Sequence, residues 1–262
     1  MAKTNDLMPR GRACAPLAIL SGLALVLLGA CQSPKTSAEL SDSDYVDNFE
    51  TIAFYREFDP DKRARRLTRW EEPLNVALVG DVTDRYLEYT LVHLDEMSEM
   101  SGLPINIVGP EDKANVVVIF SPDPFNEAVT TYRDVYSPFF SSERLMEKLT
   151  KEMEGQATCY GRIVTSDHRP NEIVAAVILI PTDQGRFIVR ACIIEELTQA
   201  MGLFNDSDDV EPSIFNDSSP NMALTDHDRI LFRLLYDQRL SPGMSWPEAE
   251  PIVRQAVTEI RT

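Results

Sequence analysis

Short apolar runs alternate with amphipathic stretches along the middle of the chain. Five runs are rich in valine, isoleucine and leucine and short enough to predict β-strands. They cover residues 74–80, 105–109, 115–121, 158–166 and 172–181. Between the first two runs, residues 82–102 carry apolar side chains at helical spacing and end on a glycine, which predicts a long helix.

Further amphipathic stretches predict helices near the start of the chain and in its second half. They cover residues 49–58, 142–154, 187–201, 224–237 and 245–260, and Gly202 ends the third of them. A segment rich in proline and aromatic residues, 121–140, is predicted to be a loop. This order of elements predicts an α/β fold. Its sheet is expected to be mixed, mostly parallel and of four to five strands, with a long backing helix and C-terminal helices.

The first 31 residues are predicted to be a signal peptide. Three basic residues precede an apolar run, 15–28, that is too short for a membrane span. The run closes on Leu-Gly-Ala-Cys, which resembles the lipobox of bacterial lipoproteins, so Cys31 is predicted to carry the lipid. The next residue, Gln32, is not the aspartate of inner-membrane retention, which favours the outer membrane and its periplasmic side. The alternative is an ordinary signal peptide with an incidental cysteine.

Residues 32–48 are rich in serine, aspartate and threonine, so they are predicted to be a flexible tether. A single domain is expected over residues 49–262. The whole chain has a formal net charge of −17, and the signal peptide carries three basic residues and one acidic residue, so the remaining chain has −19. This charge argues against nucleic acid as a partner.

Two of the four cysteines, Cys14 and Cys31, belong to the predicted signal peptide. Cys159 and Cys192 are then a single pair in an oxidising compartment, and we expect them to form a disulfide. The alternative is two buried free thiols.

A cluster of basic residues stands out in this acidic chain. Its members are Lys62, Arg63, Arg65, Arg66 and Arg69. They could bind lipid headgroups, an anionic glycan or an acidic protein surface. Alternatively, they pair with the abundant carboxylates of the chain itself.

Residues 193–215, IIEELTQAMGLFNDSDDVEPSIF, have the spacing H-E-x-x-H-x-x-G-x-x-H of a zinc protease. Glu195, Gln199 and Asn205 stand at the three histidine positions, Glu196 at the general-base position and Gly202 at the glycine. Two further motifs follow in the same order as in that class of enzyme. Ser213, Ile214 and Phe215 resemble the S-I-M Met-turn, and residues 224–237 resemble the closing helix of the matrixin group.

In these motifs and in the order of its elements, the chain resembles a metzincin-type zincin whose zinc motif has been rewritten. It is also similar to an uncharacterised bacterial family, domain of unknown function 2927, which shares the E-E-L-x-Q core. The similarity runs from about Arg66 to the C-terminus. These resemblances imply a zincin-like fold in which residues 187–201 form the active-site helix. Glu195, Gln199 and Asn205 are expected to converge in a binding cleft where zinc would sit.

One carboxylate and two amides are poor ligands for zinc, which prefers imidazole and thiolate, so we expect no metal and no cofactor. The three histidines, His93, His168 and His227, offer no i, i+4 pair. We expect a cell-envelope lipoprotein that binds a polypeptide or envelope component without cutting it, a pseudoenzyme with no catalytic residue. The alternatives are a peptidase-like hydrolase with an altered metal site or mechanism, and a purely structural envelope lipoprotein.

Overall fold

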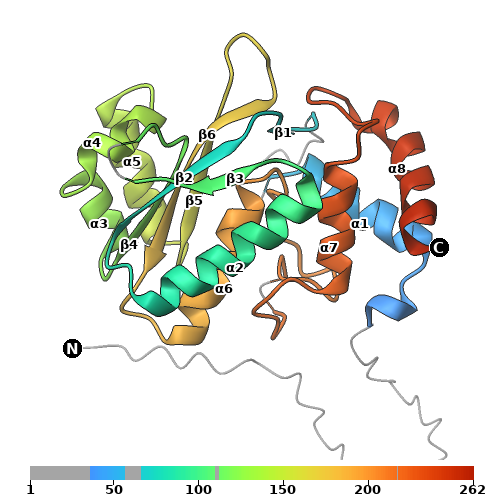
Figure 1. The fold of residues 1–262 in the computed structure, drawn as a ribbon, viewed down its shortest axis with the longest axis horizontal. Coiled ribbons are helices and arrows are strands. Elements are labelled where there is room, and N and C mark those ends of the chain that lie inside the picture. The colour runs from blue at the N-terminus through green and yellow to red at the C-terminus, as the bar shows by residue number, and fades with distance from the viewer. Residues whose placement is uncertain (1–35, 57–65, 110–111, 217) are drawn as a thin grey trace, which may run out of the picture. The chain divides into compact units, whose positions relative to one another are not determined.

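The computed structural model describes residues 36–56, 66–109, 112–216 and 218–262. At its centre is a six-stranded sheet (Figure 1). The strands are β1 (Arg69–Trp70), β2 (Leu74–Gly80), β3 (Ile105–Ile107), β4 (Val116–Ser121), β5 (Tyr160–Thr165) and β6 (Glu172–Pro181). Five strands lie in the order β1-β6-β4-β2-β3 and are parallel, whereas β5 pairs antiparallel with β6.

Helices cover both faces of this sheet (Figure 1). One face carries α2 (Asp84–Ser101) and α6 (Arg186–Gln199). The other carries α3 (Pro124–Val129), α4 (Arg133–Tyr136), a 3-10 turn (Ser137–Phe139) and α5 (Glu143–Glu154). Three more helices, α1 (Asp42–Phe54), α7 (Asp226–Leu235) and α8 (Trp246–Arg261), pack on one another, and α7 also contacts α2.

Side chains alternate between the two faces along the central strands. In β4, Val116, Val118 and Phe120 belong to the core shared with α2 and α6. Val117 and Ile119 belong to the smaller core under α3 to α5. A strand that is buried on both faces has a continuous apolar sequence, and this explains the clear strand pattern of residues 115–121 and 172–181.

The predicted mixed, mostly parallel α/β fold is confirmed, with two differences in detail. The sheet has six strands because the two-residue β1 adds to it, pairing Arg69 with Glu172 and Trp70 with Ile173. The prediction of a loop over residues 121–140 was wrong, since α3 and α4 lie there. Pro124 fits the first turn of α3 because that position needs no amide hydrogen.

The folded part also begins earlier than predicted. Residues 42–48 were expected in the tether, but they form the first half of α1, which Ser41 caps. Tyr45, Val46 and Phe49 are almost completely buried there, against α7 and α8. Three large apolar side chains on one helical face outweigh the polar composition of the segment.

The predicted signal peptide and the lipidated Cys31 lie outside the described residues, as do Lys62, Arg63 and Arg65 of the basic cluster. Among the helices that the structure describes, none has the length and apolar character needed to cross a bilayer.

Candidate functional site

The site is built on α6, whose C-terminal end is held by side chains from distant elements. Trp70 Nε1 donates to the carbonyl oxygen of Ala200 (2.9 Å), and the Tyr236 hydroxyl donates to that of Met201 (3.0 Å). Gly202 has a φ of +128°, and a Cβ there would overlap the carbonyl oxygen of Thr68. The helix therefore ends where the sequence predicts, and only glycine fits the turn that follows.

Glu196, at the general-base position, points at the edge strand β5. Its side chain is only 7% exposed, and a Cβ added to Gly161 of β5 would lie 2.7 Å from Glu196 Oε2. Glycine at position 161 therefore lets the carboxylate approach the backbone of the strand. Burial raises the pKa of the neighbouring Tyr160, and the charge of Glu196 adds to this increase, while Arg162 opposes it.

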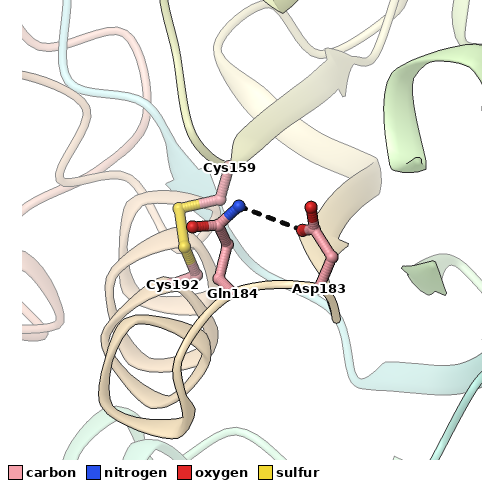
Figure 2. The surroundings of a disulfide bond; sticks show 4 residues. All are labelled: Cys159, Asp183, Gln184 and Cys192. Atoms are coloured by element: carbon pink, nitrogen blue, oxygen red, sulfur yellow. Dashed lines mark hydrogen bonds between the residues drawn. A yellow bond between two sulfur atoms is a disulfide. The ribbon is translucent and has the colours of Figure 1, made fainter. Parts of the chain in front are cut away.

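A disulfide joins the same two elements. Cys159, directly before β5, is bonded to Cys192 of α6, and their Cα atoms are 5.8 Å apart (Figure 2). Beside the bond, Gln184 Nε2 donates to Asp183 Oδ1 (3.0 Å). The predicted pairing is confirmed, and it fastens the edge strand to the middle of α6.

The structure shows contacts of two of the three former ligand positions. Gln199 Nε2 donates to Asp206 Oδ1 (2.8 Å). The backbone amide of Asn205 is bonded to the carbonyl oxygen of Ile52 on α1 (3.2 Å). Asp206 was not predicted from the sequence, because the zinc-protease motif places its third ligand at position 205. The Asp206 carboxylate stands one residue later.

The Met-turn-like segment is shaped by a carboxylate that the sequence did not single out. Asp228, fully buried in α7, accepts from the Ser213 hydroxyl (2.6 Å), the Ile214 amide (3.0 Å) and the Thr225 amide (2.8 Å). Ser213 Oγ in turn accepts from the Phe215 amide (3.1 Å). The available signal was the pattern Thr-x-x-Asp over residues 225–228, a capping box at the start of α7.

His227 is also part of this buried arrangement. Asn48 Nδ2 of α1 donates to His227 Nε2 (3.1 Å). The proton on the ring is therefore on Nδ1, which faces Asp228 Oδ1 (3.4 Å). Every polar atom of the ring has a partner in the core, so His227 links α1 to α7 and has a structural role.

His93 connects α2 with α6. The Thr198 hydroxyl donates to the carbonyl oxygen of Ile194 (2.6 Å), so its oxygen accepts from His93 Nε2 (2.9 Å). His93 Nδ1 faces Glu96 (3.8 Å), which also pairs with Arg229 of α7 (2.6 Å). These two neighbours lower the pKa of Glu96 to about 2.

Two members of the basic cluster are described, and both have structural partners. Arg69 is buried and donates to three carbonyl oxygens at the end of α7, those of Leu235, Asp237 and Leu240. A cation at this position satisfies carbonyl groups that have no helical partner. Arg66 donates to the carbonyl oxygen of Gly243 (2.7 Å). For these two arginines the structural interpretation holds.

The comparison with protein families supports one of the two resemblances. The family described as "Protein of unknown function (DUF2927)" matches residues 42–255, most of the chain. The chain belongs to the DUF2927 family. The match begins at Asp42, the first residue of α1, and not near Arg66 as expected. The resemblance to metzincin-type zincins stays a prediction, and no curated protein matches the chain.

The described side chains of this DUF2927 protein do not offer a set of ligands that fits a zinc ion. Among the described residues, no group of three or more histidine, cysteine, aspartate or glutamate side chains is arranged to hold a metal. His93 and His227 are engaged with Thr198 and Asn48, and Cys192 is in the disulfide. The amide nitrogen of Gln199 is turned toward Asp206. We therefore derive no chemical step through a metal.

Proposed function

We propose that this DUF2927 protein is a cell-envelope lipoprotein that binds an extended polypeptide and does not cut it. Cys31 carries the lipid and holds the domain at the outer membrane, on its periplasmic side. The domain is related in form to a zincin that has lost its zinc ligands. The polypeptide lies along β5, next to the helix that carries Glu195 and Glu196.

The position of β5 carries this proposal. The strand pairs with β6 on one side, and no described strand pairs with its other side. An unpaired strand edge offers backbone amide and carbonyl groups to an extended chain. The disulfide holds this edge against α6, so the edge is ready for binding without further ordering.

Several features argue against hydrolysis at the same place. Neighbouring residues on a helix point about 100° apart, so Glu195 and Glu196 cannot act as a facing carboxylate pair. The Glu196 side chain is directed at Gly161, and it has little exposed surface. Cys192 is bonded to Cys159, so it offers no thiolate nucleophile.

Hydrogen exchange tests the proposal directly. The chain from residue 32 onward is incubated with a mixture of unstructured peptides, and amide exchange and peptide masses are both followed by mass spectrometry. We expect slower exchange over β5 and peptides of unchanged mass. A second edge strand, β3, pairs with β2 alone among the described strands and is the internal control, since its exchange should not change.

Two results would argue against the proposal in different ways. Cleaved peptides would support the hydrolase alternative. If no peptide slows amide hydrogen exchange over β5 in the folded protein, the edge of β5 is not a binding site.

A further inference from the structure

The most exposed large apolar side chains of the described residues lie on two neighbouring helices. Val92 of α2 is 65% exposed and Phe187 of α6 is 55% exposed, and Leu91 of α2 is 43% exposed. α2 and α6 pack on each other on one face of the sheet (Figure 1). Exposed apolar groups gathered in this way are typical of an interaction surface.

Arginines lie over aromatic rings of these two helices. The Arg186 guanidinium lies over the Phe187 ring (4.7 Å), and that of Arg190 lies over Tyr89 of α2 (5.5 Å). Arg85 is exposed one turn before Tyr89, on the same face of the helix. None of the three arginines forms an ion pair with a described residue, whereas arginines such as those at 133, 229, 239 and 254 do.

Guanidinium groups next to exposed aromatic and apolar side chains suit the surface of a bilayer. Arginine donates to phosphate oxygens in a bidentate way, and aromatic rings prefer the headgroup level. Asp84 and Glu88 are also exposed on α2, so the surface is not uniformly positive. Phe187 and Val92 must therefore supply a large part of the attraction to the bilayer, and the arginines give the preference for anionic headgroups.

The length of the predicted tether brings a bilayer within reach. Ten residues separate Cys31 from Asp42, and this stretch spans at most about 40 Å. The first described residues and the amino-terminal ends of α2 and α6 lie along the lower side of the domain in Figure 1. A domain held this close to a membrane can rest on it through a surface that would bind weakly without an anchor.

We propose that an "α2–α6 surface" rests on anionic phospholipid and fixes the orientation of the anchored domain. It consists of Arg85, Tyr89, Val92, Arg186, Phe187 and Arg190. The inference uses the anchoring part of the proposed function and is independent of peptide binding at β5.

A fluorescence experiment on vesicles tests this orientation. The chain from residue 32 carries an N-terminal histidine tag in place of the lipid and is held on vesicles that contain nickel-chelating lipid, so the test does not depend on acylation of Cys31. The Phe187→Trp variant reports contact through quenching by brominated phospholipid. The Val135→Trp variant is the matched control, because Val135 is exposed on α4, on the opposite face of the sheet.

On vesicles of phosphatidylcholine with phosphatidylglycerol, we expect the brominated lipid to quench the tryptophan of the Phe187→Trp variant. We expect no quenching of the tryptophan added in the Val135→Trp variant. Charge reversal by Arg186→Glu with Arg190→Glu should remove most of this quenching, because each basic side chain contributes about fivefold to partition onto an anionic surface. The same reversal at two exposed residues of α5, Arg144→Glu with Lys151→Glu, should leave it unchanged.

Equal quenching at both tryptophan positions would mean that the domain has no preferred orientation. Absence of quenching at position 187 would mean that the surface meets something other than lipid. Either result overturns the inference. Quenching of equal strength on pure phosphatidylcholine would refute the role of the arginines. The proposed function is tested separately by peptide binding at β5, and the vesicle results do not affect that test.

Discussion

At the residue scale, Asp228 holds the Met-turn-like segment against the start of α7. Its two oxygens accept from the Ser213 hydroxyl and from the backbone amides of Ile214 and Thr225; the first two contacts are buried and the third is part-buried. A carboxylate has acceptor sites only, so it suits a place where every neighbour donates. The Met-turn-like shape of Ser213–Phe215 therefore depends on a residue of α7.

We predict that Asp228→Asn lowers the free energy of unfolding by about 2 to 4 kcal/mol, because the new amide group directs hydrogens at groups that already donate. Urea unfolding followed by circular dichroism measures the change. The matched control is Asp226→Asn, two residues earlier on the same helix. The Asp226 side chain is 86% exposed, and its ion-pair partner among the described residues is Arg229, so its change should stay within about 0.5 kcal/mol. Equal losses for the two variants would contradict this account.

At the scale of elements, the disulfide joins an edge strand to a helix. An edge strand has only one neighbour, and β5 is half-buried along nearly its whole length. The Cys159–Cys192 bond closes a loop of 33 residues, which contains β6 and the start of α6. Its removal should therefore affect β5 first and the rest of the sheet less.

We predict that Cys159→Ser with Cys192→Ser lowers stability by about 3 to 4 kcal/mol, the chain-entropy value for a loop of this length. Urea unfolding gives the total, and hydrogen exchange should show the largest loss of protection over residues 160–165. Wild-type protein treated with a thiol reductant is the control and should behave like the variant. An unchanged unfolding midpoint in both would mean that packing alone holds the strand.

At the scale of the whole molecule, a polar network connects three helices. Glu96 of α2 contacts His93, which reaches α6 through Thr198, and it pairs with Arg229 of α7. These contacts lower the pKa of Glu96 from its ordinary value of 4.5 to about 2. A folded-state pKa below the unfolded value contributes stability that is present above pH 4.5 and is lost as the pH falls toward 2.

We therefore predict that Glu96→Gln is less stable than the wild type at neutral pH, and that the difference disappears as the pH falls from about 5 to about 2. Unfolding by urea at a series of pH values gives the two curves. Glu99→Gln, an exposed change on the same helix, is the control and should follow the wild type. A difference that persists at the acidic end would assign the effect of Glu96 to packing and not to its charge.

Much of the fold could be predicted because buried strands and helices have recognisable patterns of apolar residues along the chain. The strands at 74–80 and 172–181 were predicted at their exact limits, since residues on a buried strand must be apolar at neighbouring positions. α1 was predicted to begin too late, because residues 42–48 hold only two buried apolar side chains, Tyr45 and Val46, among polar ones. β1 was missed because a two-residue strand has no periodicity.

The sequence by itself determined the α/β class, the order of the main elements, the helix end at Gly202 and, by cysteine count, the one disulfide. Each of these follows from local pattern or from counting. Only the tertiary structure decided the partners of the polar groups: Glu196 against Gly161, Gln199 with Asp206, and Arg69 with the end of α7. Arg69 and Leu235 are 166 residues apart in the chain. A hydrogen bond requires two atoms to meet within about 3 Å. No spacing along the sequence specifies such a meeting, because it depends on how whole helices and strands pack.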